Sequence, residues 1–167
     1  MRYLNQHLLF VSLLVLFYSC NNKPGSDISD QDRMFLQIAG SAGIMEVEMG
    51  KLALQHATRP ELKSYGKMMV NEHTSFNQEY KDLLKRIGEQ GADRMNPQNQ
   101  AMVDKLALQR GSAFDSAYVH HMVSDHKLGV EKFTEALEVA KNEDYISFLK
   151  KGLTIVKHHY EEALKLQ

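Results

Sequence analysis

Apolar residues recur every three or four positions along most of this 167-residue chain, and this spacing indicates amphipathic helices. Capping and turn residues divide the pattern into five predicted helices. These run over residues 29–57, 58 to 88 or 91, 96–111, 112–141 and 142–167. β-branched residues are sparse and no alternating strand pattern appears. The sequence therefore predicts an all-α fold with four long helices and one short helix.

Each predicted helix begins with a capping signal. The signals are Ser29 with Asp32, Thr58 with Glu61, Asn96 before Pro97, Ser112 with Asp115, and Asn142. Tight turns at 57–60 and 141–144 pair the long helices as two hairpins. A longer connection over 89–112, which contains the short helix, joins the hairpins. This arrangement predicts a ferritin-like four-helix bundle.

The N-terminal segment differs from the rest of the chain. Arg2 is followed by an apolar run of about ten residues, Leu8 to Tyr18, and then by Ser19 and Cys20. A charged start, an apolar stretch and a small residue are typical of a secretory signal peptide, and the run is too short to span a bilayer. The sequence therefore predicts export from a bacterial cytoplasm.

Cys20 is the single cysteine, so an internal disulfide is excluded. Its position resembles the lipobox of a bacterial lipoprotein, in the looser form seen in Bacteroidetes. We therefore expect a signal peptide over 1–19, a lipidated Cys20 with a flexible tether over 20–30, and a helical domain over 31–167. The alternative is a plain signal peptide with an incidental cysteine. The resemblance implies a cell-envelope location, periplasmic or at the outer membrane, with lipid on Cys20 as the membrane contact.

Charge excludes one class of partner. Removal of 1–19 takes away one charged residue, Arg2, and leaves 19 Lys and Arg against 21 Asp and Glu. A nucleic-acid-binding protein would show a basic stripe, so no nucleic-acid partner is predicted.

Polar residues within the apolar stripes are the candidate site. Glu46, His73, His126 and His159 each fall within or at the edge of an inward-facing stripe. With a rise of about 1.5 Å per residue, the two polar residues of each hairpin lie at similar depth, near mid-helix. We predict that these four side chains meet and bind one transition-metal ion, of zinc, iron, copper or nickel. Glu72 and Asp125, each directly before a histidine, are expected to bind the ion as well or to orient its ligands.

Other interpretations of these residues remain open. The four side chains also suit a buried polar network that fixes how the helices pack. Five methionines with two histidines suit a copper(I) site, although methionine commonly fills gaps in helical cores. These residues are Met45, Met49, Met68, Met69, Met122, His120 and His121.

Two absences restrict the chemistry. The residues three before the candidate histidines are valines, Val70, Val123 and Val156, so the paired Glu-x-x-His pattern of di-iron bundles is missing. No nucleophile elbow, phosphate-binding loop or His-Glu-x-x-His helix occurs. The sequence thus favours a non-enzymatic protein.

Six short stretches of the sequence, taken together, resemble stretches found in a bacterial family of unknown function. They are Asp32–Phe35, Glu46–Ala53, Met69–His73, Phe114–Tyr118, Met122–His126 and His159–Ala163. The resemblance covers about residues 30–166. Members of that family are exported or lipid-anchored, are often labelled predicted outer membrane proteins, and are grouped with ferritin-like folds. The family commonly has a proline before the last histidine, where this chain has Thr154, Ile155 and Val156.

The sequence as a whole predicts a lipid-anchored envelope protein with a ferritin-like bundle that binds a transition metal through Glu46, His73, His126 and His159. The alternative is a non-catalytic scaffold module that docks an envelope protein partner and contains a structural polar network.

Overall fold

The computed structural model describes residues 27–167. It contains five α-helices, α1 (Asp30–His56), α2 (Pro60–Ile87), α3 (Pro97–Ala107), α4 (Gly111–Val139) and α5 (Glu143–Leu164). No strand occurs in this part of the chain, which confirms the all-α prediction. The predicted signal peptide and Cys20 lie outside the described residues.

Local capping explains most of the helix boundaries. Ser29 and Asp32 form the predicted capping box at the start of α1. Asn96 and Asn142 cap α3 and α5, and each side chain accepts a hydrogen bond from a backbone N–H in the first helical turn. Gly88 ends α2 with a φ of 69°, a conformation that glycine adopts without steric cost.

Two predicted caps are replaced by a tertiary contact. The N-cap of α2 is Arg59 and that of α4 is Arg110, and neither side chain makes a capping bond. Thr58 instead donates through its backbone N–H (3.0 Å) and its hydroxyl to the carboxylate of the buried Asp115. These bonds join the α1–α2 turn to the N-terminal part of α4.

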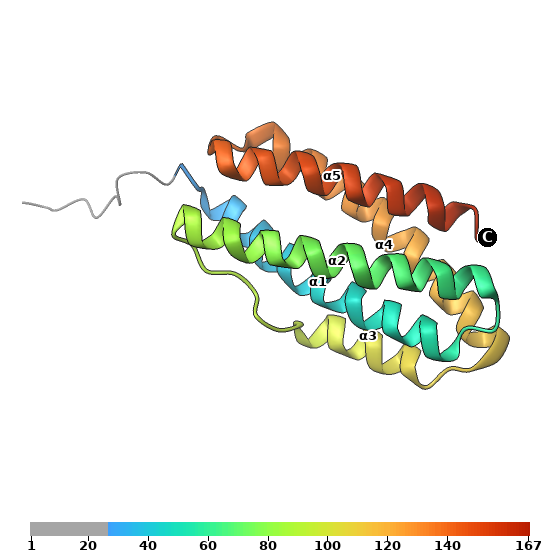
Figure 1. Ribbon diagram of the computed structural model, residues 1–167. Coiled ribbons are helices and arrows are strands. Elements are labelled where there is room, and N and C mark those ends of the chain that lie inside the picture. Colours follow the sequence, from blue (N-terminus) through green and yellow to red (C-terminus); the bar gives the residue numbers. More distant parts are fainter. Residues whose placement is uncertain (1–26) are drawn as a thin grey trace, which may run out of the picture.

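The helices lie side by side along one long axis (Figure 1). α1 and α2 form one antiparallel hairpin, and α4 and α5 form another; α2 contacts α5, α1 contacts α4, and α3 covers α1. Gly50 and Gly66 allow α1 and α2 to approach closely, since a Cβ at Gly50 would lie 2.8 Å from the carbonyl oxygen of Gly66. The segment between α2 and α3 is held against α1. Tyr80 donates to Leu36 O (2.8 Å) and accepts from Ala92 N (3.1 Å).

The apolar core is divided into two clusters. One cluster, which includes Met45, Leu62 and Met122, lies toward the α1–α2 turn. The other, which includes Leu36, Phe76 and Leu149, lies toward the α4–α5 turn. Along α2, α4 and α5 the residues of the two clusters are separated by His73, His126 and His159, respectively. A polar layer therefore crosses the middle of the core.

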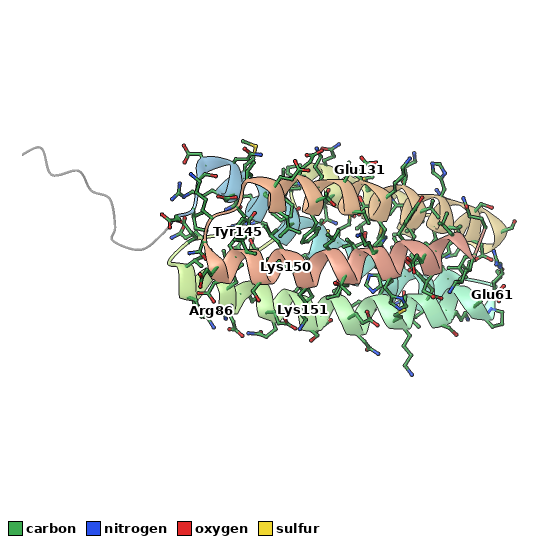
Figure 2. All side chains as sticks on the ribbon, turned by 90° about the horizontal axis from the view of Figure 1, so that it is seen from above. Glu61, Arg86, Glu131, Tyr145, Lys150 and Lys151 are labelled. Atoms are coloured by element: carbon green, nitrogen blue, oxygen red, sulfur yellow. The ribbon has the colours of Figure 1, made fainter. Side chains whose placement is uncertain are left out.

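The outer surface is polar, with exposed charged side chains such as Glu131, Lys150 and Lys151 (Figure 2). Ile38 lies on the outer side of α1, where it is 57% exposed, while Leu36 is fully buried. Within residues 27–167, no helix is both long and apolar enough to cross a membrane.

Candidate metal centre

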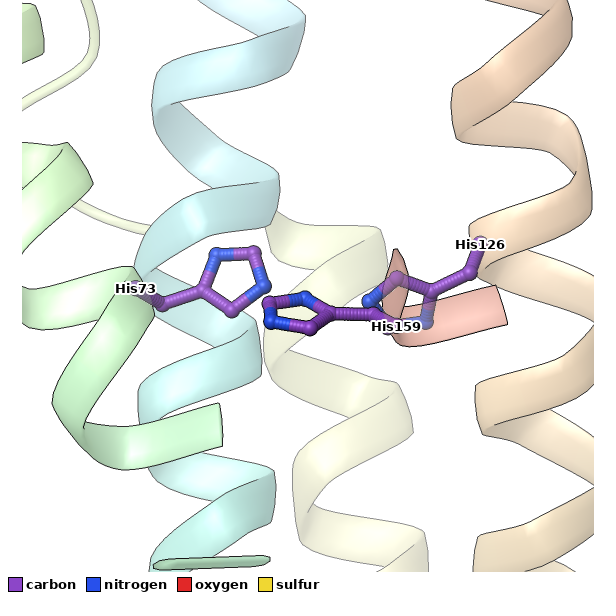
Figure 3. A group of neighbouring side chains, drawn as sticks. All are labelled: His73, His126 and His159. Atoms are coloured by element: carbon purple, nitrogen blue, oxygen red, sulfur yellow. The ribbon is translucent and has the colours of Figure 1, made fainter. Parts of the chain in front are cut away.

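Three buried histidines meet between three helices. His73 comes from α2, His126 from α4 and His159 from α5, and their rings point toward one another (Figure 3). The ring centroids are 5.0 Å apart for His73 and His159, 5.3 Å for His126 and His159, and 6.0 Å for His73 and His126. The structure thus brings together the three histidines that the sequence singled out.

Hydrogen bonds orient two of the three rings. Nδ1 of His126 lies 2.8 Å from the carbonyl oxygen of Met122, so this nitrogen carries the proton and Nε2 keeps a free lone pair. Nε2 of His159 lies 2.9 Å from a carboxylate oxygen of Glu72, which leaves Nδ1 of His159 free in the same way. Neither nitrogen of His73 has a hydrogen-bond partner among the described residues. Each ring therefore offers an unprotonated nitrogen to the space between the helices.

Burial keeps these rings neutral. Desolvation, followed by the repulsion of His159, lowers the pKa of His126 to about 4. Desolvation also lowers the pKa of His159 and, together with the other two histidines, holds the pKa of His73 well below its ordinary value. Neutral imidazole is the form that binds metal ions, so the three rings have the protonation state that metal binding requires.

The spacing of the nitrogens suits one ion. One nitrogen from each ring lies within 4.8 Å of the other two. An ion centred among them would be no more than about 2.8 Å from each nitrogen, against the ~2.0–2.1 Å of a zinc–imidazole bond. Reaching this bond length requires each nitrogen to move toward the ion by at most ~0.8 Å. The two hydrogen-bonded partners, Glu72 and Met122 O, are of the kind that hold metal-binding histidines in place.

Glu46 lies in a second polar group. One carboxylate oxygen of Glu46, one of Asp125 and a ring nitrogen of His121 lie within 4.8 Å of one another. The sequence-based prediction groups Glu46 with the three histidines and gives Asp125 a supporting role there. It includes His121 only in the alternative copper(I) site with the methionines. His121 and Asp125 are four residues apart on α4 and therefore share a helix face, a signal that could have found this group.

The two groups share a cavity. Glu46 and Asp125 line a cavity of about 70 Å³ together with His73 and His126. By the same measure a single water needs only ~10–15 Å³. The cavity, which also extends along apolar side chains such as Phe76 and Phe133, is therefore large enough to hold water molecules.

The methionines lie in the apolar core instead. Met45, Met49, Met69 and Met122 are buried in the cluster toward the α1–α2 turn, and Met68 packs against it. This environment favours the interpretation that they fill gaps between the helices.

The fold and this cluster define an all-α protein with a buried histidine centre. The chain belongs to the family described as a domain of unknown function, DUF4142, whose model matches residues 20–166. A comparison with curated proteins gave no significant match. Among solved structures the chain is similar to a DUF305 fragment from Deinococcus radiodurans, with a TM-score of 0.73 and 11% identity, over 86% of this chain and 97% of that one. At this identity the likeness concerns the fold alone.

Proposed function

We propose that this protein binds a transition-metal ion through His73, His126 and His159. The observation that carries this proposal is that three buried imidazoles, one from each of three helices, place one ring nitrogen each within 4.8 Å of the other two. A buried polar atom without a partner is costly. An ion between the three rings would give a partner to His159 Nδ1 and to one nitrogen of His73.

The ligand set indicates the kind of ion. Three neutral imidazoles suit zinc, copper, iron or nickel better than calcium or magnesium, which prefer oxygen ligands. Three protein ligands leave a coordination position for water or another small molecule. The function we propose is therefore the binding of a first-row transition-metal ion.

We also propose that the chain is a ferritin-like bundle and that lipid on Cys20 anchors it to the cell envelope. The two antiparallel hairpins, joined by a long connection that includes α3, support a ferritin-like bundle of four long helices with α3 at its side. The apolar run before Cys20 supports export and lipid anchoring to the cell envelope. The family match begins at residue 20, which is consistent with a separate leader over 1–19.

The test is metal content. The full chain is purified in detergent without chelator, loaded with Zn²⁺ and desalted, and zinc per chain is measured. The His73→Gln/His126→Gln double variant should lose one equivalent. His158→Gln is the matched control, because His158 is an exposed neighbour of His159 on α5, and it should bind as much zinc as the wild type.

If the double variant keeps all of its zinc, the proposal fails. The histidines would then be a structural polar network, as in the scaffold alternative. Circular dichroism of each variant shows whether a loss of zinc reflects a lost site or a lost fold.

A further inference from the structure

We infer that Glu46, His121 and Asp125 form a second divalent-cation site beside the histidine centre. This site goes beyond the proposed function, because its ligands are two carboxylates and one imidazole rather than three imidazoles. It also differs from the single ion predicted from the sequence.

The first observation is the burial of Glu46 without a partner. Glu46 is 2% exposed, and neither of its carboxylate oxygens has an N–H or O–H donor in the described part of the chain. A carboxylate oxygen of Asp125 lies within 4.8 Å of a carboxylate oxygen of Glu46. A buried carboxylate normally has charged or hydrogen-bonding partners, so this side chain is arranged for a cation.

The second observation is the charge of the group. No Lys or Arg of residues 27–167 makes an ion pair or hydrogen bond with Glu46 or Asp125. Burial, and then the repulsion of Asp125, raises the pKa of Glu46 well above its ordinary value. A doubly charged cation balances two carboxylates and removes this repulsion.

His121 completes the site. Its Nε2 is buried and has no hydrogen-bond partner among the described residues. One of its ring nitrogens lies within 4.8 Å of a carboxylate oxygen of Glu46 and of Asp125. The ring is therefore available as a nitrogen ligand. One nitrogen and two oxygens suit Mn²⁺, Fe²⁺ and Zn²⁺.

The second site lies next to a surface pocket. His121 also lines a surface pocket of about 230 Å³ between α3 and α4, together with His120, Met49 and Met102. Glu46 and Asp125 in turn line the inner cavity with His73 and His126. His121 thus borders the surface pocket and also belongs to the group formed with the buried Glu46 and the half-buried Asp125.

The competing interpretation is a shared proton. If one of the two carboxyl groups is protonated, Glu46 and Asp125 can form a hydrogen bond with each other and need no metal. The substitution Glu46→Gln separates the two cases. Glutamine has nearly the same shape and its amide donates to Asp125, so it preserves a hydrogen-bonded pair while it removes one negative ligand.

The experiment measures bound metal in the full chain after loading with Mn²⁺ or Zn²⁺ alone. We expect two zinc equivalents in the wild type and one in each of Glu46→Gln and Asp125→Asn. Manganese, which favours oxygen ligands, should bind the wild type and be lost in both variants. Glu48→Gln, an α1 carboxylate that pairs with Lys51, is the matched control and should bind like the wild type.

Each outcome decides between the sites. Unchanged metal content in both carboxylate variants overturns the second site and leaves the histidine centre standing. Loss of all metal in Glu46→Gln, with the fold intact, also overturns it, because Glu46 would then bind the same ion as the histidines. If His73→Gln/His126→Gln loses nothing while Glu46→Gln loses one equivalent, the second site stands and the proposed function fails. His121→Gln serves as the third variant if a carboxylate variant does not fold.

Discussion

Nε2 of His159 on α5 lies 2.9 Å from a carboxylate oxygen of Glu72 on α2. The imidazole is fully buried, whereas the Glu72 side chain is 41% exposed. A partly solvated carboxylate therefore holds a buried ring from the solvent side and fixes which nitrogen faces the interior.

This pair predicts the effect of Glu72→Ala on metal binding. Loss of a carboxylate that orients a metal-binding histidine typically lowers metal affinity about 10- to 100-fold. We expect a fall of this size in a competitive zinc titration, with the number of sites unchanged. Glu79→Ala is the control, because Glu79 also joins α2 to α5, through Lys151, but lies away from the histidines. An equal effect of both substitutions would contradict the assigned role.

The metal-free protein should lose stability as the pH falls from 7.5 to 5. The pKa of His126 is about 4 when folded, against 6.5 for an ordinary histidine, so the unfolded chain takes up more protons in this range. His126 alone then contributes about 2 kcal/mol of stability at pH 7.5 that is lost by pH 5. Urea unfolding in the presence of a chelator measures the change.

His126→Gln should show a smaller loss between the same two pH values, since the group that titrates is gone. The comparison uses the difference between pH values within each variant, so an overall destabilisation of His126→Gln does not affect it. A pH dependence equal to that of the wild type would show that His126 is not buried as a neutral ring.

Two glycines should respond in opposite ways to alanine. At Gly152 a Cβ would lie 2.7 Å from Cζ of Phe133 and 2.8 Å from Cζ of Phe76, and overpacking of this kind costs about 1–3 kcal/mol. At Gly129 the nearest atoms would be 3.7 Å away, so Gly129→Ala should gain up to about 1 kcal/mol from helix propensity. Chemical denaturation measures both, and a destabilised Gly129→Ala would contradict the packing described for α4 and α5.

The Thr58–Asp115 contact should matter for stability. Asp115→Ala removes the acceptor of two hydrogen bonds at a buried position, and we expect a loss of about 1–3 kcal/mol. Asp104→Ala removes an exposed carboxylate that accepts from Gln100 and should change stability by less than about 0.5 kcal/mol. If the two substitutions lower the free energy of unfolding equally, measured by thermal or urea unfolding, the hydrogen bonds between Thr58 and Asp115 make no specific contribution to stability.

The helices were predictable because their signals are local. The capping box of Ser29 and Asp32 and the glycine at 88 act within one turn, and the positions of His73, His126 and His159 follow from helical spacing. Thr58 and Asp115 show where local reasoning fails. Both fit a capping box within their own helices, but they bind each other instead, and a partner 57 residues away leaves no mark in the local pattern.

The grouping of Glu46 was beyond the sequence for a different reason. Counting residues from a turn gives the depth of a side chain along a helix. The depths predicted in this way for Glu46, His73 and His126 agree with the structure, in which all three side chains line one cavity. Counting does not give the rotation of one helix about its axis relative to its neighbours. That rotation turns Glu46 toward Asp125 and His121 on α4.

The polar layer also has a consequence for how the molecule opens. It interrupts hydrophobic contact along the long axis, so the two apolar clusters lie on opposite sides of it. Without an ion, amide protons at the two ends should exchange with solvent through separate local openings. An ion bound to α2, α4 and α5 at once would cross-link the two halves of the bundle. Amide protons at both ends should then exchange slowly and at similar rates.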